Sequence, residues 1–239
     1  MKLAIMQPYA FPYLGYFQLI SAVDLFVLYD DVAFIKQGWI NRNVLGARQG
    51  PQRFTLPVCK PRLGQPIAAI ELYRAQANKR RLLATIESLY RRAPCYDQVR
   101  PVRETAIGDE EENLALYIKH GLEILNEYLG IETPLVRSSK RHADCRAKGE
   151  ARVIEICRAE GAGTYINAEG GRHLYDEAAF RRQGIDLRFL VHEPRPYRQN
   201  RSGFMPRLSV IDAMMFNSPA ELARLLAGYR LVRAPQGAG

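Results

Sequence analysis

Short apolar runs alternate with amphipathic segments from the first residues of the chain onward. Residues 2–6 and 25–29 are apolar runs of strand length, and residues 16–23 between them carry apolar side chains at helical spacing. This order predicts a β-loop-α-β unit at the start of the chain. Later apolar runs predict further strands at residues 134–137, 164–167 and 186–191.

Helical periodicity fills most of the chain between and after these strands. It predicts helices at residues 78–94, 113–129, 149–160, 171–183, 208–215 and 220–227. Residues 53–58 and 67–73 are predicted as strands, and we expect them to form a hairpin across the Pro- and Gly-containing turn at residues 59–66. Strands that alternate with helices indicate an α/β fold with a mainly parallel sheet sandwiched by helices.

The chain shows no linker, internal repeat or low-complexity segment. We therefore expect a single domain over residues 1–233 and a flexible tail at residues 234–239. No segment reaches the roughly 18 uninterrupted apolar residues that a membrane span needs, and no signal-peptide layout follows Met1. These features predict a cytoplasmic protein without a membrane span. The four cysteines are scattered and lack C-x-x-C spacing, which favours reduced, structural thiols.

Positive charge is unevenly distributed along the chain. The 34 Lys and Arg residues against 25 Asp and Glu residues give a net charge of +9. Residues 74–103 contain eight cations and two acids, and residues 181–207 contain seven arginines and two acids. Such clusters suit phosphate-rich partners such as nucleotides, sugar nucleotides, anionic headgroups or RNA. The alternative is a solvated, arginine-rich face.

Ligands of parallel sheets bind at the carboxyl ends of the strands, so we searched the segments that follow each predicted strand. The first of these segments contains two prolines and several aromatic residues before a predicted helix. Proline rigidity and a glycine at the turn suit a loop whose amides meet an anion at a helix N-terminus. The predicted binding residues of this segment are Gln7, Tyr13, Gly15, Tyr16 and Gln18. The alternative is that these aromatic side chains pack in the core.

Two carboxylates follow the second predicted strand. Asp30 and Asp31 are candidates for a general base or for Mg²⁺ binding, although aspartates after a strand also cap turns. The next polar segment contains Lys36, Trp39, Asn41 and Arg42, and its single Trp beside cations and amides can stack on a base or sugar. A Trp that anchors the loop on the core is the competing interpretation.

Two later segments complete the set of candidates. Asn167 ends a predicted strand, and Gly170 and Gly171 follow it at a position where glycine permits close approach of a ligand to the backbone. Ser209 and Asp212 stand at the spacing of a capping box at a helix start, which makes capping the simpler account of this pair. P-loop, dinucleotide-binding, zinc-protease and nucleophile-elbow motifs are missing from the sequence.

Taken together, these segments resemble the WbqC-like protein family over nearly the whole chain. The matching segments are residues 4–20 (AIMQPYAFPYLGYFQLI), 29–32 (YDDV), 38–43 (GWINRN), 164–167 (TYIN) with Gly170-Gly171, and 208–212 (LSVID). The resemblance implies a role in O-antigen, lipopolysaccharide or other surface-polysaccharide biosynthesis, or in natural-product biosynthesis. It also implies a transferase, with amino-acid transfer onto amino sugars as one suggested activity. No catalytic residue comes with it.

The first β-loop-α-β unit is also similar to that of the nucleotidylyltransferase superfamily, whose fold belongs to the HUP and Rossmann-like group. The corresponding turn there reads His-x-Gly-His and grips ATP phosphates, whereas this chain has Tyr13-Leu14-Gly15-Tyr16. Tyrosine donates a hydrogen bond but carries no positive charge near pH 7. This departure leaves nucleotide binding open and weakens the case for adenylation.

We therefore expect a transferase that forms an amide by placing an acyl or aminoacyl group, such as glycyl, on an amino sugar or related amine. In this hypothesis the residues of the opening turn bind the donor, Asp30 or Asp31 receives the acceptor's proton, and Lys36, Trp39 and Arg42 hold phosphate and base. One alternative is an ATP-dependent adenylating enzyme with Mg²⁺. Another is an RNA- or tRNA-binding module, or a tRNA-dependent transferase, that uses residues 74–103.

Overall fold

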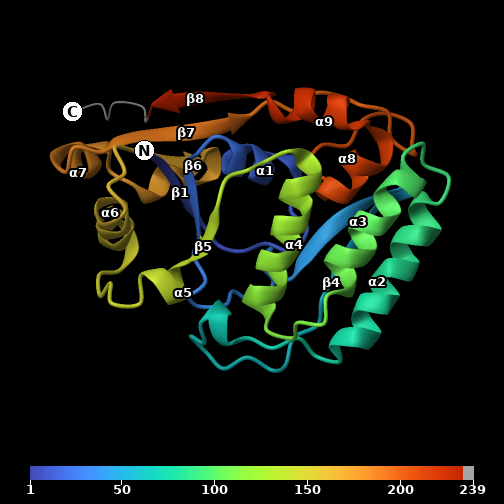
Figure 1. The fold of residues 1–239 in the computed structure, drawn as a ribbon, viewed down its shortest axis with the longest axis horizontal. Coiled ribbons are helices and arrows are strands. Elements are labelled where there is room, and N and C mark those ends of the chain that lie inside the picture. Colours follow the sequence, from blue (N-terminus) through green and yellow to red (C-terminus); the bar gives the residue numbers. More distant parts are fainter. Residues whose placement is uncertain (234–239) are drawn as a thin grey trace.

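The computed structural model describes residues 1–233, and its centre is a six-stranded sheet (Figure 1). Five strands are parallel and a sixth, at one edge, is antiparallel. In spatial order the strands are β5 (Leu135–Arg137), β2 (Leu25–Leu28), β1 (Lys2–Met6), β6 (Thr164–Ala168), β7 (Asp186–His192) and β8 (Tyr229–Arg233). The predicted α/β fold with a mainly parallel sheet is confirmed. The predicted tail at residues 234–239 lies outside the described residues.

Helices cover both faces of the sheet because alternate side chains of each strand point to opposite faces. Leu3 and Ile5 of β1 pack in one apolar cluster with α6 (Gly149–Ala159) and α7 (Glu177–Arg182). Ala4, between them, packs in a second cluster with α1 (Leu14–Ser21) and further helices. Those helices are α4 (Leu114–Leu129), α8 (Val210–Phe216) and α9 (Pro219–Leu226).

The order of the strands reverses beside β1. The chain passes from β1 through α1 to β2 on one side, whereas β6 and β7 lie on the other side. β1 pairs with β2 from Leu3–Leu25 to Met6–Leu28, but its pairing with β6 runs from Lys2–Thr164 to Leu3–Tyr165. Open α/β sheets bind their ligands at the carboxyl ends of the strands at such a reversal. The edge where β1, β6 and β7 end is therefore the expected position of a ligand site.

The segment between β2 and β5 forms a helical region at one side of the sheet (Figure 1). It contains the hairpin of β3 (Arg42–Ala47) and β4 (Gly50–Thr55), then η1 (Ile67–Ala69), α2 (Ala75–Tyr90), α3 (Tyr96–Gly108) and α4. The predicted hairpin of residues 53–58 with 67–73 is wrong. Residues 67–69 form a 3₁₀ turn, and the two segments meet at a bridge between Val58 and Leu72.

Two short elements after β5 and β6 complete the fold. They are α5 (Ser138–Arg141) and η2 (Glu169–Leu174).

The ends of α4 show why its prediction succeeded. Asn113 accepts a hydrogen bond from the amide of Leu116 at 3.2 Å, and Gly130 ends the helix in the left-handed conformation that glycine favours.

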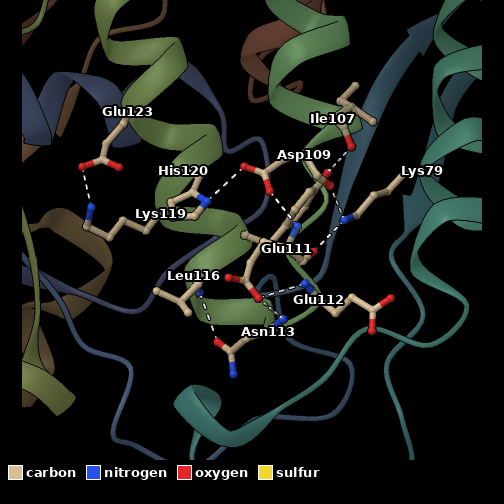
Figure 2. A network of polar contacts seen from close by, with 11 residues as sticks. Lys79, Ile107, Asp109, Glu111, Glu112, Asn113, Leu116, Lys119, His120 and Glu123 are labelled. Carbon is tan, nitrogen blue, oxygen red and sulfur yellow. Dashed lines mark hydrogen bonds and ion pairs between the residues drawn. The ribbon is translucent and has the colours of Figure 1, made fainter.

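A buried lysine ties α2 to the acidic loop before α4 (Figure 2). Lys79 is 1% exposed, and its Nζ donates to the carbonyls of Asp109 at 2.5 Å and Glu111 at 2.6 Å. The same ammonium group lies 4.5 Å from the centroid of the Tyr117 ring. Burial lowers the pKa of Lys79, and the acidic side chains of the loop oppose that effect. Lys79 therefore holds the fold together and does not belong to a basic surface.

Candidate functional site

The two tyrosines of the opening turn lie in different environments. Tyr16 is 3% exposed, packs against Phe26, and donates its hydroxyl hydrogen to the carbonyl of Gln7 at 2.9 Å. Burial raises its pKa well above 10. Tyr13 is only half-buried, and its ring meets that of His192 edge-on at 5.7 Å between centroids. Tyr16 therefore lies in the core, while Tyr13 lies beside a second polar ring.

Gly15 makes room for the ring of Tyr13. A Cβ atom at this position would lie 2.3 Å from the Cε2 atom of Tyr13, so the ring occupies the space over the first turn of α1. The sequence hypothesis had predicted that an anion binds in that space. Close packing, rather than approach of a ligand to the backbone, explains the glycine.

We expect Gly15→Ala to displace the Tyr13 ring and to lower the free energy of unfolding by about 1–3 kcal/mol, the usual cost of overpacking. Urea denaturation measures this loss. Tyr13→Ala removes the clashing ring, so the double variant should lose less stability than the two single changes added together. Additive losses would show that the ring and the glycine do not compete for this space.

His192, the last residue of β7, is oriented by Gln18 of α1. Gln18 is fully buried, and its Nε2 donates to the carbonyls of Leu225 at 2.8 Å and Gly228 at 3.0 Å. Its Oε1 must therefore be the atom that accepts a hydrogen bond, and Nδ1 of His192 lies 2.7 Å away. This contact places the proton of a neutral imidazole on Nδ1 and leaves the lone pair on Nε2.

Two effects keep the His192 ring neutral. Burial lowers the pKa of His192 below its ordinary 6.5, and the nearby cation Arg207 lowers it further. At pH 7 the ring is therefore a neutral imidazole whose Nε2 has an unshared electron pair. A side chain with a perturbed pKa in a concave site is a candidate catalytic group. In many enzymes a further side chain orients the general base by a hydrogen bond, and Gln18 makes such a contact with His192.

The His192 ring lines a pocket at the carboxyl end of β7. We call this pocket the β7 pocket, and its polar and aromatic lining includes Tyr13, His192, Arg195, Tyr197, Phe204 and Arg207. Burial raises the pKa of Tyr13, so its phenol stays protonated near pH 7 and is able to donate a hydrogen bond. A neutral imidazole, a phenol and two arginines therefore border one small pocket, which encloses about 20 Å³.

A buried carboxylate supports one wall of the β7 pocket. Asp212 is 1% exposed, and it accepts hydrogen bonds from Tyr90 at 2.9 Å, Tyr197 at 2.8 Å and Gln199 at 3.1 Å. Burial raises the pKa of Asp212, and these donors oppose that rise. Asp212 fixes the Tyr197 phenol in the pocket wall, so the structure gives it a positioning role behind the site.

Ser209 lies next to Asp212 but acts on the backbone. Its hydroxyl donates to the carbonyl of Phe11 at 2.8 Å and accepts from the amide of Ile211 at 3.4 Å. The expected capping role of Ser209 at the start of α8 is therefore present. Asp212 does not complete a capping box, because its carboxylate is directed to the two tyrosines and Gln199.

The two candidate carboxylates after β2 face the end of β5 and the start of α5. Asp30 is fully buried and contacts Arg137 Nε at 2.6 Å, Ser139 N at 2.8 Å and Ser139 Oγ at 2.7 Å. Asp31 accepts from Ser138 Oγ at 2.7 Å and pairs with Arg152. These donors occupy the oxygens of both carboxylates, so the geometry favours positioning of α5 and of Arg152 over direct proton transfer.

Arg152 and Asn167 lie at the carboxyl edge on the α6 side of the sheet. The Arg152 guanidinium lies 5.8 Å from the centroid of the Tyr29 ring, and burial raises the pKa of that tyrosine to about 12. Asn167 is buried, and a Cβ on Gly171 would lie 2.9 Å from its Nδ2. Gly171 thus makes room for the Asn167 side chain, while Gly170 is exposed.

The third predicted segment divides between the surface and the hairpin. Lys36 and Trp39 are exposed on the loop before β3. Asn41 is buried and donates to the carbonyl of Leu56 at 2.8 Å, and Arg42 is half-buried in β3. The structure therefore brings Tyr13 and Gln18 together at the β7 pocket and leaves Lys36 and Trp39 on a separate projection.

The sequence hypothesis missed His192 and Arg207. His192 comes one residue after the predicted strand 186–191, so the search of strand ends held the signal that could have found it. Arg207 belongs to the second basic stretch and has φ +60°, a left-handed conformation that is uncommon outside glycine. Within residues 1–233, no group of three or more His, Cys, Asp or Glu side chains is arranged to hold a metal ion.

Comparison with known proteins decides the family. The model of the WbqC-like protein family matches residues 7–224 of this chain. The chain belongs to this family. The chain is also similar to the "Uncharacterized protein Rv1507c" of Mycobacterium tuberculosis, with 32% identity over 226 residues. The similar region covers 92% of this chain and 95% of that protein. No solved structure matches the chain.

The WbqC-like match includes the whole turn after β1 and every lining residue of the β7 pocket except Leu225. None of the helices described over residues 1–233 has the length and apolar character needed to cross a membrane.

Proposed function

We propose that this WbqC-like protein is a transferase that forms an amide in the β7 pocket, with His192 as its general base. The observation that carries the proposal is the pair of hydrogen bonds from Gln18 to main-chain carbonyls, because they force Gln18 to accept from His192. A neutral imidazole held in one tautomer is the state that a base needs at pH 7.

The proposed reaction joins an acyl or aminoacyl donor to an amine such as that of an amino sugar. The amine nitrogen attacks the acyl carbonyl carbon, and Nε2 of His192 takes the proton that the nitrogen loses. The bond between the carbonyl carbon and the leaving group then breaks, and the leaving group departs with the electron pair. The new C–N bond is the amide.

The cations of the pocket suit a substrate that carries phosphate. Arg195 and Arg207 border the same pocket as His192, and a guanidinium group binds phosphate oxygens through two parallel hydrogen bonds. Arg195 Nη1 donates to the carbonyl of Arg224 at 3.2 Å, so Arg207 is the better candidate. Because the pocket encloses only about 20 Å³, the phosphate would contact these side chains from outside it. A nucleotide-linked amino sugar, as expected in surface-polysaccharide biosynthesis, has both an amine and phosphates.

The sequence hypothesis gave the role of base to Asp30 or Asp31. Both are positioning residues in this proposal, because Arg137 and Ser139 occupy the oxygens of Asp30, and Arg152 and Ser138 occupy those of Asp31.

The state of the His192 ring can be measured without a known substrate. We expect ¹⁵N NMR of the imidazole nitrogens to show a proton on Nδ1 and a pKa below the ordinary 6.5. Uridine diphosphate should shift the His192 signals, whereas those of the exposed His173 should stay in place. A proton on Nε2 at pH 7, or a pKa at or above the ordinary value, would remove His192 as the base.

Adenylation by a nucleotidylyltransferase-like mechanism is the main enzymatic alternative. Tyr16 lies in the core, and Tyr13 covers Gly15, so the turn that grips phosphate in that superfamily is closed here by its own side chains. Release of pyrophosphate from ATP that depends on an acid substrate would nevertheless replace amide transfer by adenylation as the leading function.

RNA binding is a third possibility, from a different class of function. Of the eight cations in residues 74–103, Lys79 and Arg103 are buried. The six exposed arginines are Arg74, just before α2, and five others on α2, on α3 and on the turn between them. Tight tRNA binding that weakens steeply with salt would favour a tRNA-dependent transferase, because phosphate contacts release counterions.

A further inference from the structure

Two adjoining loops expose apolar side chains at their tips. Ile35 is 53% exposed and Trp39 is 49% exposed on the loop before β3, and Leu63 is fully exposed on the loop after β4. We define the loop-tip patch as Ile35, Lys36, Trp39, Lys60, Arg62 and Leu63. Its apolar members take no part in the β7 pocket, and the proposed function gives them no role.

The loops that hold the loop-tip patch are joined at their bases. The amide of Phe34 donates to the carbonyl of Gln65 at 2.8 Å, and the amide of Ile67 donates to the carbonyl of Val32 at 3.0 Å. A bridge between Ala33 and Pro66 lies between these two contacts. The exposed side chains therefore belong to one projection of the molecule.

Local hydrogen bonds fix the shape of both tips. The side chain of Gln65 accepts from the amide of Arg62 at 2.9 Å and donates to the carbonyl of Ala69 at 2.6 Å. In the other loop, the amide of Gly38 donates to the carbonyl of Ile35 at 3.1 Å. Because both turns are closed by their own contacts, the apolar side chains are held outward.

The chain segment that carries the loop-tip patch has charges of a single sign, and the nearest acid along the chain after it is Glu71, whose carbonyl accepts from the amide of Cys59 at 2.8 Å. Residues 32–70 contain no Asp or Glu, and they contain the six cations Lys36, Arg42, Arg48, Arg53, Lys60 and Arg62. Lys36, Lys60 and Arg62 are exposed on the same two loops as the apolar tips. Apolar side chains flanked by lysine and arginine suit the interface of an anionic membrane, where the tips enter the acyl boundary and the cations meet the headgroups.

The composition of the loop-tip patch also argues against two other partners, a second copy of this chain and nucleic acid. In a symmetric contact between two copies, the same patch faces itself, so like charges would repel with no acid in the segment to offset them. Nucleic acid would satisfy the cations but leaves Ile35 and Leu63 in water. We therefore propose that the loop-tip patch docks this protein on an anionic lipid surface.

The single Trp of the chain lies in the loop-tip patch and reports directly on docking. We expect the emission of Trp39 in the full chain to shift to shorter wavelength with vesicles of phosphatidylcholine and phosphatidylglycerol. Pure phosphatidylcholine vesicles should give a much smaller shift, and added salt should weaken the response to the anionic vesicles because it screens the cations.

Matched variants distinguish vesicle binding through the loop-tip patch from non-specific adsorption of the protein to vesicles. Ile35→Gln with Leu63→Gln should weaken vesicle binding about tenfold or more, because the tips lose their burial in the acyl boundary. Lys60→Gln with Arg62→Gln should reduce the preference for anionic vesicles. Leu174→Gln, which changes a 57% exposed leucine on η2, is the control and should bind like the wild type.

Three results would overturn this proposal. They are a Trp39 emission that anionic vesicles leave unchanged, equal vesicle binding by the patch variant and the wild type, and a Trp39 shift that follows protein concentration or an RNA oligonucleotide instead of vesicles. Vesicle binding is independent of turnover, so its failure would leave the proposed transferase intact, and failure of the transferase would leave docking intact.

Discussion

Asp30→Ala is expected to lower the free energy of unfolding by about 3 kcal/mol. The Asp30 carboxylate is fully buried, and its removal leaves Arg137 Nε and the Ser139 amide and hydroxyl without their acceptor. A buried ion pair that loses one partner is costly because the other charge stays desolvated. Arg137 is 18% exposed and gains some water, so the loss belongs at the lower end of the usual range. Urea denaturation followed by circular dichroism measures it.

Asp186→Ala is the matched control for this prediction. Asp186 contacts Arg188 Nε at 2.6 Å, the same distance as the Asp30–Arg137 contact, but its side chain is 44% exposed. Exposed ion pairs contribute about 0–1 kcal/mol, so the control should lose little stability. Equal losses in the two variants would mean that burial does not set the strength of the Asp30 contacts.

The sequence predicted the elements whose signals are local. The helix at residues 113–129 was placed correctly because Asn113 caps its start and Gly130 ends it. α3 was missed, since Pro101 inside the helix and a polar composition weaken its pattern. β8 was missed because it is a short edge strand with two arginines, and its pairing partner β7 comes much earlier in the sequence. Such elements depend on contacts that local periodicity does not contain.

The candidate site shows the same division. The opening turn was found from its prolines and aromatics, but the different environments of Tyr13 and Tyr16 depend on distant parts of the chain. Gln18 and His192 are 174 residues apart in sequence, and the carbonyls that orient Gln18 come from the end of α9 and the residues just after it. The fold brings His192 and Gln18 together from distant parts of the chain. A sequence motif, which relies on residues a few positions apart, therefore cannot identify this pair.

We expect His192→Ala to lower kcat for amide formation about 10²- to 10⁴-fold once a donor and acceptor pair is known, the usual contribution of a general base. Free imidazole in the assay should restore part of the rate, because it supplies the missing base in the space that the variant opens. The control is His173→Ala, which changes an exposed histidine outside the pocket and should leave kcat unchanged.

The pH dependence of kcat/KM tests the same role from a different direction. His192 must be neutral to accept a proton, so the rate should fall only below pH 6.5, where the lowered pKa of this residue lies. Arg207→Gln removes the cation that helps to lower that pKa, so the acid limb of the profile should move to higher pH. A merely structural His192 would leave the acid limb unmoved in the Arg207 variant, and imidazole would rescue nothing. The combination of rescue and a moved acid limb therefore separates a proton acceptor from a side chain that only supports the pocket.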